Sequence, residues 1–170
     1  MSPVPERAVL SIGSNLGDRL GHLQGALDQL AERGIRVLGV SPVYQTAPVG
    51  GVEQDDFLNI IAIVESDLSP VDLLARCQEV EAVHDRVRDI RWGPRTLDVD
   101  IVSIDGIVMD DPALTLPHPR AHERAFVCIP WLDINPAARI GTDDVASLEL
   151  ETVGVQRRDD LRLRRPGGTP

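Results

Sequence analysis

The pattern of apolar and polar positions predicts two amphipathic helices. Four leucines within residues 20–30 recur at spacings of three, four and three residues. This spacing places them on one side of an α-helix, which we expect to end near Gly34. A second helix is expected to begin after Ser69-Pro70, because serine caps helices and proline is favoured at the first helical position.

Four other segments have the composition and the alternation of β-strands. They are residues 7–12, 35–45, 57–64 and 96–104. The third is almost continuously apolar, which is typical of a central strand, and the second contains Pro42, which favours an edge. With the helices between them, the order is β-α-β-β-α-β. This order predicts an α+β fold of the ferredoxin-like kind, in which helices pack on an antiparallel sheet.

The chain beyond residue 104 has weaker signals. Asp105-Gly106 is a hairpin turn signal, so we expect a short strand over residues 107–109. Residues 111–119 are expected to be a proline-rich loop, and residues 121–132 a short helix or turn. The last residues are polar and contain Pro and Gly. We therefore expect one domain over residues 1–155 and a flexible tail over residues 156–170.

Composition excludes several classes of protein. The chain has 170 residues with 17 basic residues, all arginine, against 27 acidic ones, for a net charge of −10. This balance argues against a nucleic-acid partner, and the absence of lysine excludes a P-loop or Schiff-base lysine. Cys77 and Cys128 lie far apart, which fits a reducing compartment. With no long apolar run and no signal peptide, we expect a cytoplasmic protein without a membrane partner.

Two carboxylates follow a group of arginines in mid-chain. Asp98 and Asp100 alternate with apolar residues on a predicted strand, so both point to one face. Such a pair can hold Mg²⁺ together with substrate phosphates. The arginines that precede them are Arg86, Arg88, Arg91 and Arg95. Either feature alone also fits a solvated strand or loop, but together they favour a polyphosphate such as ATP.

Two further groups have the chemistry of ligand-binding residues. Phe57 and Asn59 share one face of a predicted strand, where the ring can stack on a flat heterocycle and the amide can recognise its polar edge. His118 lies in the proline-rich loop near Arg120 and Arg124, where it could donate a hydrogen bond to a phosphate. Considered singly, Phe57 and Asn59 fit a core aromatic and a structural amide better than a ligand site, and a lone histidine is usually structural.

Longer motifs resemble one family. They are GSNLGDR at residues 13–19, QDDFLN at 54–59, RWGPRTLDVD at 91–100 and PHPR at 117–120. Their order and spacing, from about residue 8 to 137, resemble the 6-hydroxymethyl-7,8-dihydropterin pyrophosphokinases. The resemblance implies an enzyme of folate biosynthesis that moves the β,γ-pyrophosphoryl group of ATP to the hydroxymethyl group of a dihydropterin, releases AMP and uses two Mg²⁺ ions.

The resemblance also implies a role for individual residues. Both Mg²⁺ ions would be held by Asp98 and Asp100. The residues implied in catalysis are Arg86, Arg95, Asp98 and Asp100. Those implied in pterin binding are Gly13, Thr46, Val49, Phe57, Asn59 and Phe126. Those implied in nucleotide binding are Gln78, Glu81, Arg88, Arg91, Trp92, Ile101, His118 and Arg124. We expect residues 84–95 to be mobile without nucleotide and ordered with it.

Two other functions stay open from the residues alone. Paired aspartates also serve nucleotidyltransferases, which would need a third carboxylate and would transfer the nucleotidyl group rather than release AMP. A non-catalytic ferredoxin-like module could bind a ligand without turnover. That second interpretation leaves the carboxylate pair beside the arginines without a role.

Overall fold

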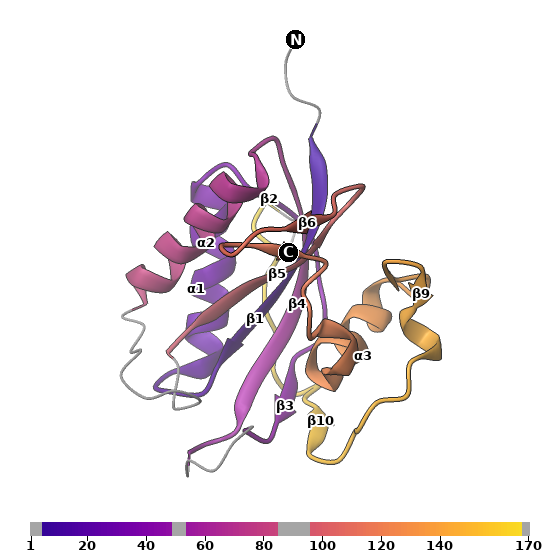
Figure 1. Cartoon of the computed structure of the whole chain (residues 1–170). Helices are drawn as coiled ribbons and strands as arrows, with labels where there is room; N and C mark the ends of the chain where they lie inside the picture. The colour runs from indigo at the N-terminus through magenta and orange to yellow at the C-terminus, as the bar shows by residue number, and fades with distance from the viewer. Residues whose placement is uncertain (1–4, 49–53, 85–95, 168–170) are drawn as a thin grey trace.

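Six strands form one antiparallel sheet in the computed structural model, which describes residues 5–48, 54–84 and 96–167 (Figure 1). They are β1 (Glu6–Ser14), β2 (Arg36–Val40), β3 (Tyr44–Thr46), β4 (Phe57–Ser66), β5 (Asp98–Ile104) and β10 (Val155–Arg157). The order is β10-β3-β4-β1-β5, and β2 also pairs with β4. Helices α1 (Arg19–Glu32) and α2 (Pro70–Val83) complete the β-α-β-β-α-β order. The predicted ferredoxin-like α+β fold is confirmed.

The strand expected over residues 35–45 is divided into β2 and β3, which pair with different parts of β4. The break lies at Ser41 and Pro42. The Ser41 amide donates to the carbonyl of Ile61 at 2.8 Å, and the Ile61 amide donates to the Ser41 hydroxyl at 2.8 Å. Pro42 has no N–H group with which to continue the ladder, and the Ser41 hydroxyl takes the place of a strand carbonyl as the acceptor for the Ile61 amide.

Both predicted helices lie on one face of the sheet (Figure 1). Asp18 caps α1 by accepting the Gly21 amide at 3.0 Å, and Ser69 caps α2 by accepting the Asp72 amide at 3.2 Å. The leucine stripe of α1 and the apolar face of α2 bury themselves against alternate residues of the strands. The sheet residues of this core include Leu10, Ile12, Ile60, Ala62 and Ile101. This layer is what the amphipathic periodicity predicted.

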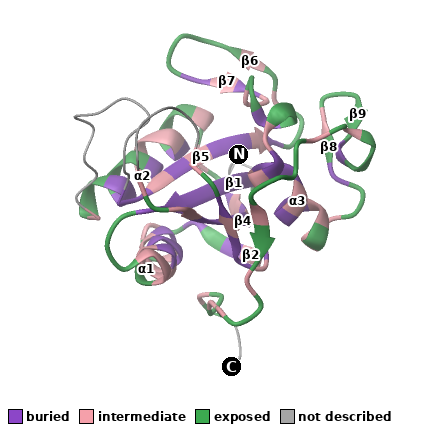
Figure 2. Cartoon of the chain, turned by 90° about the horizontal axis from the view of Figure 1, so that it is seen from below, coloured by how far each residue is buried: buried purple, intermediate pink, exposed green. Residues whose placement is uncertain are grey.

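A third helix, α3 (Ala125–Ile134), covers part of the opposite face and follows a short 3₁₀ turn, η1 (Ala121–Glu123). Val127 and Trp131 pack there against Val9, Ile61 and Val102. Buried residues of β1, β4 and β5 therefore lie between two helical layers (Figure 2). Within residues 5–48, 54–84 and 96–167, no helix is both long enough and apolar enough to cross a membrane.

The strand expected over residues 107–109 does not form a hairpin with the strand before it. The turn at Asp105-Gly106 forms, with a φ of 73° at Gly106 and a 3.0 Å hydrogen bond from the Ile107 amide to the Ile104 carbonyl. The strand after it, β6 (Met109–Asp110), pairs with β7 (Thr115–Leu116) instead of folding back along β5. The outer edge of β5 is occupied by the following loop, whose His118 amide donates to the Val102 carbonyl at 2.7 Å.

The C-terminal segment contributes a strand to the main sheet, and the expectation of one domain over residues 1–155 with a flexible tail over residues 156–170 stays a prediction. A second small hairpin, β8 (Arg139–Ile140) and β9 (Asp143–Asp144), and the 3₁₀ turn η2 (Val145–Ser147) precede it. Strand β10 then pairs with β3, and Leu161 and Leu163 pack against the main core. The expected boundary at 155/156 therefore falls inside a strand. The polar composition concealed this pairing because only two apolar side chains anchor the segment.

Candidate active site

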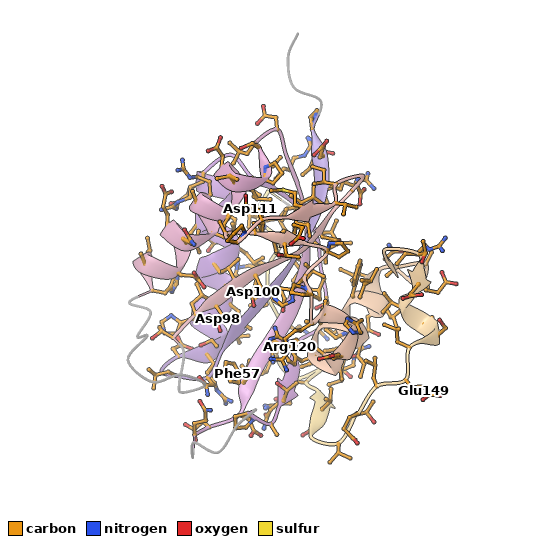
Figure 3. The ribbon with its side chains drawn as sticks, viewed as in Figure 1. Phe57, Asp98, Asp100, Asp111, Arg120 and Glu149 are labelled. Atoms are coloured by element: carbon orange, nitrogen blue, oxygen red, sulfur yellow. The ribbon has the colours of Figure 1, made fainter. Side chains whose placement is uncertain are left out.

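A row of directly paired residues crosses four strands on the sheet face that carries α3. The row runs Tyr44, Asn59, Gly13 and Asp98, from β3 through β4 and β1 to β5. Neighbouring strands lie about 4.8 Å apart, so two strand spacings place Asn59 and Asp98 about 10 Å apart across Gly13. The register therefore brings the predicted heterocycle residues and the predicted carboxylates to one end of one face, as the labelled Phe57, Asp98 and Asp100 show in Figure 3.

A buried amide dominates the β4 side of this row. The Asn59 Nδ2 group donates to Thr46 Oγ1 at 2.6 Å, and both residues are only 4 % exposed. A Cβ atom at Gly13 would lie 2.4 Å from Asn59 Oδ1, closer than two such atoms can approach. Glycine is therefore required at residue 13 by the position of the Asn59 side chain, and Phe57, opposite Thr46, completes this group.

The carboxylates of Asp98 and Asp100 lie on the β5 side, where both residues are half-buried around the buried Val99. Strand β5 is an edge strand of the sheet, so its outer N–H groups need a partner other than a strand. The Val99 amide donates to Glu81 Oε2 of α2 at 3.0 Å. Glu81, only 4 % exposed, therefore ties α2 to the strand between the two aspartates.

The two carboxylates at β5 are ligands of the kind that magnesium takes. Within residues 5–48, 54–84 and 96–167, no group of three or more His, Cys, Asp or Glu side chains could hold a metal ion. Zinc sites take three or four such ligands, whereas Mg²⁺ takes one or two carboxylates and completes its shell with water and substrate phosphates. Two carboxylates on one strand face therefore suit a metal that arrives with a phosphate ligand.

His118 lies along the outer edge of β5, where its backbone amide donates a hydrogen bond to the Val102 carbonyl. Its ring Nδ1 accepts the Arg120 amide at 3.2 Å. Burial, followed by the positive charges of Arg124 and Arg120, lowers the pKa of His118 below its ordinary value of 6.5. The ring is therefore neutral at pH 7. Since Nδ1 accepts a hydrogen bond, the proton is on Nε2, which is a donor suited to a phosphate oxygen.

Arg124 and Phe126 lie together where α3 begins. The guanidinium carbon of Arg124 lies 5.5 Å from the centroid of the Phe126 ring, a cation–π distance. Phe126 is half-buried and packs against the apolar cluster under α3. One side of its ring is thus covered by Arg124, and a stacking partner would have to use the other side.

The sequence profile of the 7,8-dihydro-6-hydroxymethylpterin-pyrophosphokinase family matches residues 9–136, which include every part of this site. The chain belongs to this family. Similar curated proteins of Methylorubrum extorquens and Mycobacterium leprae are both named 2-amino-4-hydroxy-6-hydroxymethyldihydropteridine pyrophosphokinase. The Methylorubrum protein is 42% identical over 154 residues, and the match covers 89% of this chain and 98% of that protein. The Mycobacterium leprae protein is 49% identical over 145 residues, and the match covers 79% of this chain and 74% of that protein.

The fold comparison agrees with this membership. A Plasmodium falciparum HPPK-DHPS structure superposes with a TM-score of 0.67 at 12% identity. The match covers 86% of this chain but 45% of that one, so this chain spans less than half the length of the Plasmodium chain. As a family member, the chain is an ATP-dependent pyrophosphokinase that acts on a hydroxymethyl-dihydropterin in folate biosynthesis. Membership decides against the nucleotidyltransferase and the non-catalytic module.

Several residues implied by the family resemblance are not brought to the row. Gln78 is exposed on α2, and the Ile101 side chain is buried in the helix-covered core, so only its backbone could reach a ligand on the other face. Another six lie outside the described residues: Val49, Arg86, Arg88, Arg91, Trp92 and Arg95. We expected residues 84–95 to become ordered when nucleotide binds. Almost all of them lie outside the described residues, so this stays a prediction.

Sequence reasoning assigned no role to two residues that hold the start of β4 in the pyrophosphokinase. Asn15 Nδ2 donates to Gln54 Oε1 at 2.8 Å and to the Asp55 carbonyl at 3.0 Å. Arg19 donates to the Asp56 carbonyl at 2.9 Å. Both belong to the GSNLGDR motif, so the motif was the available signal. The segment that these two residues bind lies some 40 residues later in the chain, so only the fold shows the contact.

The lowered pKa of His118 predicts a pH-dependent stability. As pH falls through 6.5, the unfolded chain binds a proton at this histidine while the folded chain resists it. The free energy of unfolding therefore decreases as the pH is lowered from about 6.5. We expect His118→Asn to flatten this dependence. Urea midpoints at pH 7.5, 6.5 and 5.5 measure it, with His122→Gln, a change at an exposed histidine nearby, as the control. An unchanged slope in His118→Asn would contradict the burial argument.

Proposed function

We propose that the pterin and the polyphosphate of ATP bind at opposite ends of the Asn59–Gly13–Asp98 row. The acceptor ring lies against Asn59 and Thr46, and the phosphates lie beside Asp98 and Asp100. The observation that carries this proposal is the strand register, which separates the two groups by about 10 Å on one face. This distance suits a bicyclic ring plus the hydroxymethyl group and the phosphate that it attacks.

On the acceptor side, the amide of Asn59 is the specificity group. It is held by the 2.6 Å hydrogen bond to Thr46, so its remaining donor and acceptor positions are oriented before a ligand arrives. A buried amide that is oriented in advance loses little entropy on binding and rejects rings with the wrong polar edge. We place Phe57 and Phe126 as the stacking residues, with the uncovered side of Phe126 toward the ring.

On the phosphate side, Asp98 and Asp100 would hold the two Mg²⁺ ions, which would neutralise charge on the phosphate oxygens. His118 would donate from Nε2 to a phosphate oxygen, and Arg124 would add a positive charge. Glu81 keeps β5 in place through the Val99 amide. The arginines of residues 86–95, Trp92 and Val49 would complete the site in the roles that the family resemblance implies.

These residues support direct transfer of the pyrophosphoryl group to the substrate hydroxyl, without a covalent intermediate on the enzyme. Burial, Glu81 and Asp100 raise the pKa of Cys77 to about 12, and burial raises that of Cys128 to about 11, so both thiols stay protonated. The hydroxymethyl oxygen would attack the β-phosphorus, and the bond from that phosphorus to the bridging α-oxygen would break. AMP leaves with the bridging oxygen, and the hydroxyl proton is released. The protein's contribution is orientation and charge stabilisation.

Product analysis tests this proposal. We expect the enzyme, incubated with ATP, Mg²⁺ and 6-hydroxymethyl-7,8-dihydropterin, to form AMP and pterin diphosphate in equal amounts. Phosphorus NMR and nucleotide chromatography distinguish AMP from ADP and from free pyrophosphate. ADP would indicate single phosphoryl transfer and pyrophosphate would indicate nucleotidyl transfer, and either would overturn the proposed geometry of attack. We also propose that the enzyme works in the cytoplasm, where its two buried cysteines stay reduced.

A further inference from the structure

The C-terminal segment reaches the proposed pterin pocket although it lies outside the family match at residues 9–136. Strand β10 pairs with β3, so Val155 lies opposite Thr46. The pairing continues at both ends. The Ala47 amide donates to the Gly154 carbonyl at 3.1 Å, and the Arg158 amide donates to the Val43 carbonyl at 2.8 Å. The three-residue strand that carries Thr46 is therefore held between β4 and β10.

A chain of side-chain hydrogen bonds joins Arg158 to the residue before Phe57. Arg158 donates to Gln45 Oε1 at 2.5 Å, and Gln45 Nε2 donates to Asp56 Oδ2 at 2.9 Å. Arginine can only donate and an ionised aspartate can only accept, so the two neighbours determine which way the Gln45 amide points. Gln45 is adjacent to Thr46, and Asp56 is adjacent to Phe57. The chain thus ends beside two residues of the proposed pocket.

Arg158 is itself held in place. Its Nε donates to Asp160 Oδ1 at 2.9 Å and its Nη2 donates to Asp160 Oδ2 at 2.7 Å, a two-pronged pair that orients the guanidinium. A second connection ties β10 to α3. Arg157 Nη1 lies 3.7 Å from Asp133 Oδ2, which also accepts a hydrogen bond from the Tyr44 hydroxyl. Burial and Asp133 raise the pKa of Tyr44 to about 12, so this hydroxyl stays a donor.

We propose that Arg158 is a positioning residue for pterin binding, acting through Gln45 on Thr46 and on the Asp56-Phe57 step. This inference rests on the proposed placement of the pterin at Thr46, Asn59 and Phe57. Without the Arg158 donor, one end of the Gln45 amide loses its partner. The strand then holds Thr46 less firmly, and the pocket no longer presents one preferred orientation of Asn59.

Replacing Arg158 with methionine, which keeps much of the length and removes every side-chain donor, tests the inference. We expect the KM for the dihydropterin to rise about three- to tenfold, while the KM for ATP and kcat stay within about twofold. Gln45→Met should have the same effect, and the double variant should be no worse than either single one. Arg158→Lys, which keeps a charged donor group on a single nitrogen, should restore part of the affinity. Arg162→Met, a change at an exposed arginine of the same segment, is the matched control.

The outcomes separate this inference from the proposed function. If Asn59→Leu leaves the pterin KM unchanged, the pocket itself is misplaced and the proposed function fails. If Asn59→Leu raises that KM while Arg158→Met and Gln45→Met do not, the positioning role is overturned. Equal losses for both substrates, with a lowered Tm, would show a general structural role and would also overturn it. Should Arg158→Met fail to fold, the Gln45→Met result decides, because that variant keeps the Arg158–Asp160 pair.

Discussion

Replacing either Asp98 or Asp100 with asparagine is expected to reduce AMP formation at least a hundredfold while the folded structure is retained. Each change keeps the shape of the side chain but removes one negative charge from the face where we place the Mg²⁺–phosphate complex. Removing a single charge-stabilising group from an active site typically costs about 10²–10³ in turnover. Both residues are half-buried on an edge strand, so the substitution creates neither a cavity nor a clash.

Turnover with saturating ATP and dihydropterin measures the effect, and the urea midpoint checks the fold. Asp105→Asn is the matched control, because Asp105 lies just beyond the other end of β5 and is exposed. Its activity should stay within about twofold of the unchanged enzyme, as expected for a surface substitution away from the site. Chelation with EDTA should abolish activity, and added Mg²⁺ should restore it. Near-normal turnover of both aspartate variants would refute the carboxylate–magnesium assignment.

Gly13→Ala is expected to weaken pterin binding by about tenfold or more. The new Cβ atom would lie 2.4 Å from Asn59 Oδ1, so the buried amide must rotate or shift and give up its hydrogen bond to Thr46. Overpacking of this kind also destabilises a fold by about 1–3 kcal/mol. The dissociation constant of the dihydropterin, measured by calorimetry, tests the first effect, and the urea midpoint tests the second.

Gly39→Ala is the control for this prediction. Gly39 also lies in a strand of the same sheet, β2, but a Cβ atom there meets nothing within 4 Å. Alanine at this position should leave pterin affinity unchanged and alter stability by less than about 1 kcal/mol, because it mainly reduces the freedom of the unfolded chain. If Gly13→Ala binds pterin as well as Gly39→Ala does, the close approach of Asn59 has no functional meaning.

The elements that were predicted correctly are those whose signals are local. Helix α1 was visible in its leucine spacing and α2 in its Ser69-Pro70 start, and the expected Ser69 cap forms. The central strand β4 followed from its apolar run. The features that local signals did not indicate concern pairing. The residue 107–109 strand and the C-terminal segment each pair with a segment that no local pattern indicates, because a strand's partner depends on what the rest of the fold leaves open.

The candidate site divides in the same way. The period of two along a strand showed that Asp98 and Asp100 share a face, and that Phe57 and Asn59 share a face. It could not show that the two faces are the same one. That follows from the β1 register, which pairs Gly13 with Asn59 on one side and with Asp98 on the other.

The sequence by itself determined the order of helices and strands, the family and the chemical character of the site, because periodicity and motif spacing are properties of neighbouring residues. Tertiary structure alone decided which groups face one another. It placed Asn59 across Gly13 from Asp98, set Glu81 on the outer edge of β5, and brought Arg158 to Gln45 across 113 residues of chain. These contacts arise from strand register and packing, which depend on the whole folded core rather than on any one segment.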